Sequence, residues 1–150
     1  MQTRVLLGDL DGFAQTVLAQ LPLQHEAAVV VALSGDLGAG KTTFTQALAK
    51  ALGILDSVQS PTYVLMKSYP IAYKEFTKLV HIDAYRLSSA TEFAALKPGS
   101  FLQDPGTLVC IEWPEKVEGA LPKPDLLLKF SSEGAAEGER FIEEVESPRN

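Results

Sequence analysis

The chain has 150 residues, 46% of them hydrophobic and 21% charged, which is enough to bury one core, so we expect a single domain over residues 1–150. One cysteine excludes an internal disulfide, and two histidines are too few for a zinc or iron–sulfur centre built on soft ligands. The formal net charge of −6 argues against direct nucleic-acid binding, and no apolar run approaches the ~18 residues of a membrane span. We therefore expect a cytoplasmic protein without membrane contact.

The N-terminal third of the chain predicts a strand, a helix and a buried strand, in that order. Residues 4–7 fit a short strand, and a helix capped by Asp11 follows, because apolar residues then recur with a helical period until Pro22. Residues 28–33 form a continuous apolar and largely β-branched run, which is typical of a central strand covered on both faces. A glycine-rich loop comes next, and residues 41–52 fit a helix.

The remaining elements are mostly strands, marked by apolar runs between turn-forming residues. The predicted strands are residues 63–69, 79–83, 107–112, 125–130 and 140–145; the predicted helix is residues 91–96; residues 70–77 are a turn or short excursion, and residues 131–139 a hairpin loop. The last two strands fit a terminal antiparallel pair, whereas the strands at 79–83 and 107–112 each end on an acid.

The glycine-rich loop fits the phosphate-binding pattern G-x-x-x-x-G-K-[ST] and lies between a predicted strand and a predicted helix, as that motif requires. Its glycines let successive backbone N–H groups turn inward, and the helix start adds a positive dipole end, so the loop suits phosphate oxygens. A glycine-rich tight turn without a ligand is the alternative. The context predicts a three-layer α/β P-loop NTPase-like mixed sheet with antiparallel additions.

Individual roles within this loop follow from side-chain chemistry. We expect Lys41 to contact the β and γ phosphates, Thr42 to bind a magnesium ion through its hydroxyl, and Thr43 to lie at the α phosphate. Lys41 is expected to be an exposed loop side chain, so that Lys41→Ala removes triphosphate binding or turnover with little loss of stability. The predicted nucleotide-binding residues are Leu37, Gly38, Ala39, Gly40, Lys41, Thr42 and Thr43.

Phosphoryl chemistry in such proteins also requires a carboxylate at the end of a buried strand, to hold the metal's water shell and orient the attacking water. Asp83 and Glu112 both satisfy this requirement, so the pattern alone does not say which acid serves the metal and which the water. We favour Glu112 for the metal and Asp83 for the water, and we take both with Lys41 as the candidate catalytic residues. Each acid could instead cap the turn that follows it.

Four further features have both a functional and a structural interpretation. His81 shares a strand face with Asp83 and could orient that carboxylate, although we favour a structural role. Arg86 either stabilises developing charge or forms a surface ion pair. Trp113 fits a packing residue or partner anchor better than a base-stacking platform. The segment Ser60-Pro61-Thr62 is either a switch that senses the γ phosphate or a plain turn.

Four motifs in this chain, taken in order and spacing, resemble the bacterial TsaE (formerly YjeE) ATPases, which are required to make threonylcarbamoyladenosine in tRNA. The motifs are Gly35-Asp-Leu-Gly-Ala-Gly-Lys-Thr-Thr43, Ser60-Pro-Thr-Tyr63, His81-Ile-Asp-Ala-Tyr-Arg-Leu87 and Ile111-Glu-Trp-Pro-Glu115. The chain departs from the family at residues 96–100, where Leu-Lys-Pro-Gly-Ser replaces the usual Leu-Gly and acidic stretch.

The resemblance implies ATP as the nucleotide, Thr42 and Glu112 as magnesium ligands, and Asp83 as a residue needed for hydrolysis. It also implies that residues 60–62 are a switch segment. Family members resemble weak ATPases that act with the proteins TsaD and TsaB, so the resemblance implies these partners and tRNA contact only through their complex.

Three other functions compete with this interpretation. A small-molecule kinase usually surrounds the transferred phosphoryl group with several arginines, whereas this chain has four, of which only Arg86 lies far from the termini. A GTP-dependent switch requires an Asn-Lys-x-Asp element, and the only asparagine here is Asn150. A non-hydrolysing, ATP-gated binding module stays open on the sequence alone.

Overall fold

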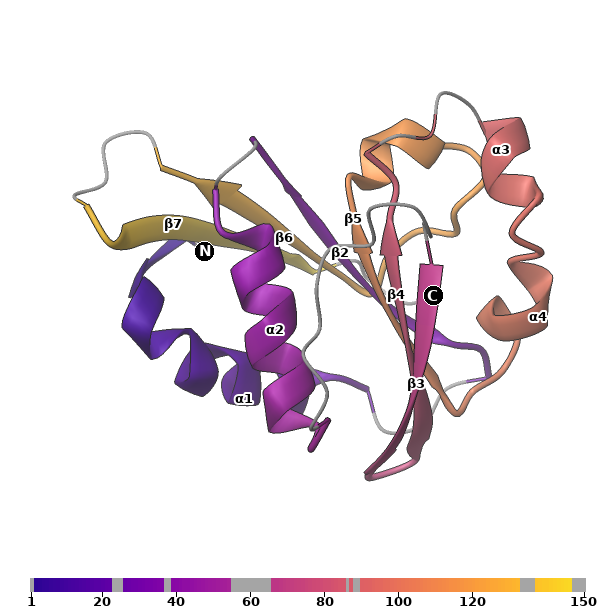
Figure 1. Ribbon diagram of the computed structural model, residues 1–150, viewed down its shortest axis with the longest axis horizontal. Coiled ribbons are helices and arrows are strands. Elements are labelled where there is room, and N and C mark those ends of the chain that lie inside the picture. Colours follow the sequence, from indigo (N-terminus) through magenta and orange to yellow (C-terminus); the bar gives the residue numbers. More distant parts are fainter. Residues whose placement is uncertain are drawn as a thin grey trace.

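The computed structural model describes residues 2–22, 26–36, 39–54, 66–85, 87, 90–132 and 137–146. These residues form a seven-stranded sheet with helices on both faces (Figure 1). The strands are β1 (Gln2–Leu6), β2 (Val29–Gly35), β3 (Met66–Tyr73), β4 (Phe76–Asp83), β5 (Thr107–Glu112), β6 (Leu126–Ser131) and β7 (Glu139–Glu146). The helices are α1 (Leu10–Gln20), α2 (Lys41–Ala51), α3 (Ala90–Ala94) and α4 (Gly99–Leu102), with 3-10 turns η1 (Leu7–Asp9) and η2 (Pro114–Val117).

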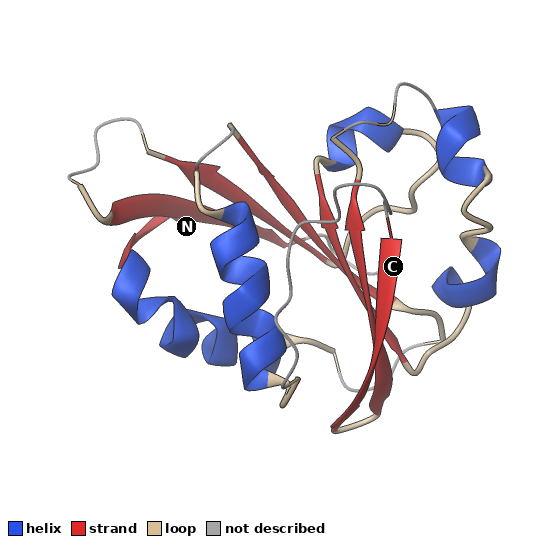
Figure 2. Cartoon of the chain, in the orientation of Figure 1, coloured by secondary structure: helices blue, strands red, loops and turns tan. Residues whose placement is uncertain are grey.

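The sheet is parallel in its centre and antiparallel at both edges. Its order is β1-β7-β6-β2-β5-β4-β3, and β6, β2, β5 and β4 run parallel to one another. β3 pairs antiparallel with β4 at one edge, and β7 pairs antiparallel with β6 and β1 at the other. The predicted three-layer mixed sheet with antiparallel additions is therefore confirmed, and Figure 2 shows α1 and α2 on the opposite face from α3 and α4.

The apolar runs of the central strands separate into two cores because successive side chains of a strand point to opposite faces. Val29, Val31 and Leu33 of β2 belong to the core beneath α1 and α2. Val30 and Ala32 belong to the core on the other face. Every residue of β5 is buried as well, because both faces of this strand are covered, which suits its apolar run at residues 108–111.

Helix α2 is held by aromatic packing at its N-terminal half. The ring of Phe44 is completely buried, and it lies 5.8 Å from the ring of Phe13 in α1 and 5.7 Å from the ring of Phe130 in β6 (centroid distances). Full burial of one such side chain stabilises the fold by about 1.5–3 kcal/mol. The packing therefore fixes the start of α2 against the sheet one turn beyond the glycine-rich loop.

Two local predictions are wrong. Residues 70–77 were expected to be a turn or short excursion, but only residues 74 and 75 turn, because β3 continues through Pro70 to Tyr73 and β4 begins at Phe76. Pro70 fits in β3 because an edge strand tolerates proline's missing N–H. Asp11 is not the helix cap: α1 begins after Asp9, and Asp11 instead forms an ion pair with Lys50 at 2.9 Å. Residues 63–65 of the predicted strand 63–69 lie outside the described residues.

The other elements agree with expectation apart from short additions. The helix expected at residues 91–96 is α3, and α4 forms directly after it in the segment where the chain departs from the TsaE pattern. Lys97 takes a positive φ of 55° between the two helices. Among the described residues, no helix is long and apolar enough to cross a membrane.

Gly35, the last residue of β2, provides a test of this packing. Its φ is +137°, and a Cβ built there would lie 2.4 Å from the carbonyl oxygen of Phe130. Gly35→Ala is therefore expected to lower the free energy of unfolding by about 2–4 kcal/mol in a urea titration. Gly12→Ala is the control, because Gly12 lies in α1 with open space around its Cα, so stability should stay unchanged or rise by up to ~1 kcal/mol. Equal stability of the two variants would contradict the close approach.

Candidate functional site

The candidate site lies where the parallel strands β2, β5 and β4 end, beside the start of α2. The register pairs Leu33 with Glu112 and Glu112 with Asp83, so the two candidate acids are direct neighbours on adjacent strands. Their side chains share one face of the sheet because they occupy the same register position. The sequence predicted both strand ends, and the structure brings them together.

The described part of the glycine-rich loop forms the start of a helix. The backbone N–H of Ala39 donates to the carbonyl oxygen of Asp36 at 3.1 Å, and Gly40 takes a left-handed conformation with φ 104°. The first helical hydrogen bond runs from the N–H of Phe44 to the oxygen of Gly40 at 2.9 Å. The N–H groups before Phe44 are thus positioned at a helix N-terminus, where they attract anions. Leu37 and Gly38 lie outside the described residues.

Lys41 is buried, which contradicts the expectation of an exposed loop side chain. Only 5% of it is exposed, and its ammonium donates to the carbonyl oxygens of Gly35 and Asp36, the latter at 3.1 Å. The ammonium also lies 3.8 Å from the centroid of the Trp113 ring. Lys41 is buried because the carbonyl groups of Gly35 and Asp36 and the ring of Trp113 lie around its ammonium. A variant at Lys41 therefore changes packing as well as charge.

The charge of Lys41 is set by two opposing effects. Desolvation lowers the pKa of its ammonium, whereas the nearby carboxylates, with Glu112 the largest contributor, raise it. In the described structure its hydrogen-bond acceptors are neutral carbonyl oxygens. A charged acceptor placed at this point would make stronger, charge-assisted hydrogen bonds with the ammonium.

Glu112 is a carboxylate with only 2% exposure, and each of its oxygens has a different partner. Oε1 accepts from the hydroxyl of Thr42 at 3.2 Å, and Oε2 lies 2.7 Å from Nε2 of the fully buried His81. The structure therefore places Glu112, and not Asp83, next to Thr42. It also connects His81 to Glu112, whereas the sequence interpretation favoured a structural role for His81 and considered Asp83 as its alternative partner.

Asp83 is half-buried and sits at the end of β4. Its Oδ1 accepts from the backbone N–H of Tyr85 at 3.0 Å, so it caps the turn that follows, as the structural alternative held for this acid. The same turn is tied to the neighbouring strand, because the N–H of Ala84 donates to the carbonyl oxygen of Glu112 at 3.0 Å. Asp83 thus has a fixed carboxylate one strand away from Glu112. Arg86 lies outside the described residues, as do Ser60, Pro61 and Thr62.

A buried polar layer continues beneath Glu112. Thr45 of α2 donates to the carbonyl oxygen of Lys41 at 3.0 Å, and its hydroxyl lies 3.7 Å from the sulfur of Cys110. The buried polar or charged residues of the described chain are Lys41, Thr45, His81, Thr107 and Glu112. All except Thr107 contribute to this one place. Such a concentration of buried polar groups is typical of a functional site, because elsewhere in a core apolar residues are more stabilising.

Trp113 packs over the site in a strained conformation. It follows Glu112 with a left-handed φ of 63°, and its N–H donates to the carbonyl oxygen of Leu33 at 3.0 Å. On one side its ring meets the Lys41 ammonium, and Tyr85, 42% exposed, lies against it at a centroid distance of 5.0 Å. Trp113 is thus a packing residue, in line with the interpretation that the sequence favoured.

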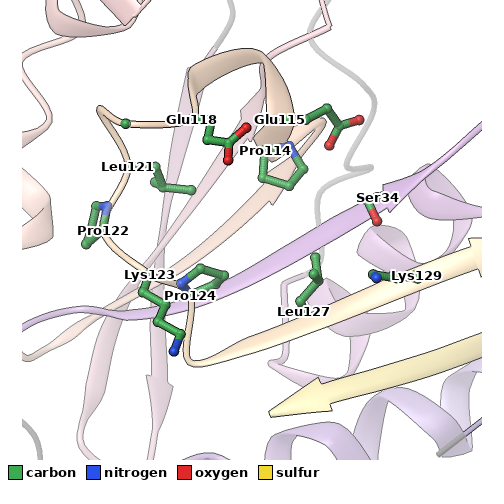
Figure 3. Close-up of a pocket in the computed structure, with 11 residues that line it drawn as sticks. Ser34, Pro114, Glu115, Glu118, Leu121, Pro122, Lys123, Pro124, Leu127 and Lys129 are labelled. Atoms are coloured by element: carbon green, nitrogen blue, oxygen red, sulfur yellow. The ribbon is translucent and has the colours of Figure 1, made fainter. Parts of the chain in front are cut away.

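A separate cavity of about 440 Å³ lies against β2 and β6, beneath the connection that follows β5. Figure 3 shows Pro114 and Glu118 on one side of this cavity, with Ser34, Leu127 and Lys129 on the other. None of the site residues predicted from the sequence lines it. The cavity is therefore distinct from the cluster around Glu112, although Ser34 directly precedes the first glycine of the loop.

The thiol beneath the site is expected to be inert. Burial raises the pKa of Cys110 from 9.0 to about 12, so its thiolate fraction falls by a factor of ~10³. Iodoacetamide at pH 8 should therefore label the native chain at least ~10³-fold more slowly than the urea-unfolded chain. Cys110 is the only cysteine, so mass spectrometry reports this site alone. Similar labelling rates in the two states would show that the layer beneath Glu112 is open.

Comparison with known proteins gives a consistent result. The family model described as "Threonylcarbamoyl adenosine biosynthesis protein TsaE" matches residues 9–142. A Haemophilus influenzae tRNA threonylcarbamoyladenosine biosynthesis protein TsaE is 39% identical over 110 residues, covering 73% of this chain and 67% of that protein. Its Treponema pallidum counterpart is 40% identical over 121 residues, covering 80% and 83% of the two chains.

A solved structure resembles the whole fold. The crystal structure of Bacillus subtilis YdiB superposes with a TM-score of 0.68 at 28% sequence identity, covering 95% of this chain and 82% of that one. The sheet order, the glycine-rich loop at the end of β2 and the family match all agree with a P-loop nucleotide-binding fold. The chain belongs to the TsaE family, whose members act in the biosynthesis of threonylcarbamoyladenosine in tRNA.

Proposed function

We propose that the chain is a magnesium-dependent ATPase subunit of the machinery that forms threonylcarbamoyladenosine in tRNA. The observation that supports this most strongly is the meeting of Lys41, Thr42 and Glu112 at the N-terminus of α2. An ammonium, a hydroxyl and a buried carboxylate at a helix start are the groups that a nucleoside triphosphate with magnesium requires.

Phosphate binding would use the loop and Lys41. The backbone N–H groups of residues 37–43 would donate hydrogen bonds to the phosphate oxygens, with Thr43 at the α phosphate. Lys41 would move its ammonium from the carbonyl oxygens of Gly35 and Asp36 to the β and γ phosphates. The exchange is favourable because a desolvated ammonium gains more from an anionic acceptor than from neutral carbonyls.

The metal would be held by Thr42 and Glu112. Their oxygens lie 3.2 Å apart, and hydroxyl and carboxylate oxygens are ligands that magnesium prefers. The described residues contain no group of three or more His, Cys, Asp or Glu side chains that could hold a metal on their own. A site with two protein oxygens suits magnesium, which keeps several waters and also binds the phosphates. When bound, the ion would neutralise charge on the β and γ phosphate oxygens.

Asp83 would orient the attacking water. It lies next to Glu112 in the register of β4 and β5, and the N–H of Tyr85 fixes its carboxylate. We therefore keep the assignment of Glu112 to the metal and Asp83 to the water. Arg86 and the segment 60–62 stay predictions from the sequence.

The partners and setting belong to the same proposal. A member of a tRNA-modification family acts in a multi-protein pathway, and we propose TsaD and TsaB as partners in the cytoplasm, with tRNA contacted only through their complex. We propose weak hydrolysis by the isolated chain and stimulation by these partners. The net charge of −6 favours docking onto a basic partner surface rather than onto tRNA.

Magnesium-dependent ATP hydrolysis by the purified chain, with and without TsaD and TsaB, tests this function. Lys41→Ala and Glu112→Gln are each expected to lower kcat by at least ~10²-fold, because the first removes a cation that stabilises negative charge in the transition state and the second removes a ligand of the metal. Lys50→Ala is the matched control: Lys50 lies in the same helix, but its exposed side chain pairs with Asp11 away from the site, so hydrolysis should not change.

Three results would contradict the proposal. ATP binding without hydrolysis under any of these conditions would favour the ATP-gated binding module. Phosphorylation of an added metabolite at a higher rate than ATP hydrolysis would favour the small-molecule kinase. Unchanged hydrolysis in Lys41→Ala, with circular dichroism showing a folded chain, would refute the site assignment itself.

A further inference from the structure

We propose that His81 is a positioning residue that holds the carboxylate of Glu112 in the orientation needed to serve the metal. The inference rests on the proposed function, because it concerns the same magnesium site. It differs from the sequence-based interpretation, in which His81 was a structural residue or a partner of Asp83.

The geometry of Glu112 shows what His81 does. Nε2 of His81 lies 2.7 Å from Oε2 of Glu112, and the other oxygen, Oε1, faces the Thr42 hydroxyl at 3.2 Å. A carboxylate held at one oxygen by a rigid ring cannot rotate about its last torsion without losing that hydrogen bond. His81 therefore fixes the plane of the Glu112 carboxylate, so that the oxygen not bonded to His81 faces the Thr42 hydroxyl.

The contact with Glu112 determines which ring nitrogen of His81 is the hydrogen-bond donor. An ionised Glu112 only accepts hydrogen bonds, so Nε2 of His81 carries the proton and donates it to Oε2. Nδ1 then carries a lone pair, and it is buried with no hydrogen-bond partner among the described residues.

A purely structural role does not account for this arrangement. His81 is fully buried beside Cys110 in the register of β4 and β5, in a position where a leucine would have no unpaired nitrogen. An unpaired buried acceptor lowers stability, because the water that it lost on burial is not replaced. The hydrogen bond to Glu112 is what a histidine supplies here and an aliphatic residue does not. Ligands held by such outer partners bind metals more tightly, because they are already oriented.

The contact also separates the two acids by role. Asp83 lies two residues beyond His81 on the same face of β4, yet the imidazole of His81 reaches Glu112 on the next strand, while Oδ1 of Asp83 accepts from the N–H of Tyr85. His81 thus supports the acid assigned to the metal. The substitution of His81 should change the magnesium requirement rather than the orientation of water.

Two variants distinguish positioning from packing. His81→Leu fills the core without a donor, whereas His81→Gln places an amide N–H near the position of Nε2 and keeps a donor for Glu112. The readout is isothermal titration calorimetry of ATP binding with magnesium and with EDTA. In the unaltered chain, magnesium should strengthen binding. In His81→Leu that enhancement should fall about tenfold or more, with unchanged affinity in EDTA, and His81→Gln should restore it to within about threefold.

A double-mutant cycle adds a readout without nucleotide. His81→Leu, Glu112→Gln and the double variant are compared in urea unfolding, and the two substitutions should couple by at least tenfold in the unfolding equilibrium constant. A normal magnesium enhancement in His81→Leu, or no coupling between the two positions, would overturn the positioning role. No magnesium enhancement in the unaltered chain would instead overturn the proposed metal site, so the two failures are distinguishable.

Discussion

The site depends on one buried carboxylate, that of Glu112, which is 2% exposed at the end of an apolar strand. Taking an ionised group out of water is costly unless polar partners replace the lost hydration. Thr42 and His81 each form a hydrogen bond with one of its oxygens, and the Lys41 ammonium is attracted electrostatically to its charge. The start of α2 and the ends of β4 and β5 are therefore held in one arrangement around this group.

The packing of the sheet makes this arrangement possible. Parallel pairing of β2, β5 and β4 brings the three strand ends to the same edge, and two apolar cores cover the strands on both faces. Phe44 fixes α2 one turn beyond the loop, so the Thr42 hydroxyl is presented to Glu112 by a rigid element. The polar layer of Thr45, Cys110 and His81 then separates the charged site from the aliphatic core.

Short sequence patterns predicted those parts of the fold that depend on the conformational preferences of neighbouring residues in the chain. The apolar run at residues 28–33 predicted the strand β2, which spans Val29–Gly35, and the spacing of glycine, lysine and threonine after it predicted the loop and the start of α2. Other features depend on contacts between elements that are distant in sequence, and short sequence patterns do not predict these. Pro70 lies inside β3 only because β3 is an edge strand, and the ion pair between Asp11 and Lys50 joins two helices that are distant in sequence.

The candidate site shows the same division. Asp83 and Glu112 were found as acids that end apolar strands, but which of them faces Thr42 depends on how β4 and β5 lie relative to α2. The burial of Lys41 and the hydrogen bond from His81 to Glu112 likewise depend on how separate elements pack against one another. One signal for the latter was present: His81 stands at period two from an acid in an apolar strand, which marks a side chain on the face that carries the site.

The central claim is that Glu112 and Thr42 complete a metal–nucleotide site on the loop. The most direct test is the affinity for ATP in the presence of magnesium and in EDTA, measured by calorimetry on the unaltered chain and on Glu112→Gln. We expect magnesium to strengthen ATP binding only in the unaltered chain, while the two chains bind ATP equally well in EDTA or the variant binds it more tightly. An equal gain from magnesium in both chains would show that Glu112 does not serve the metal and would contradict the account.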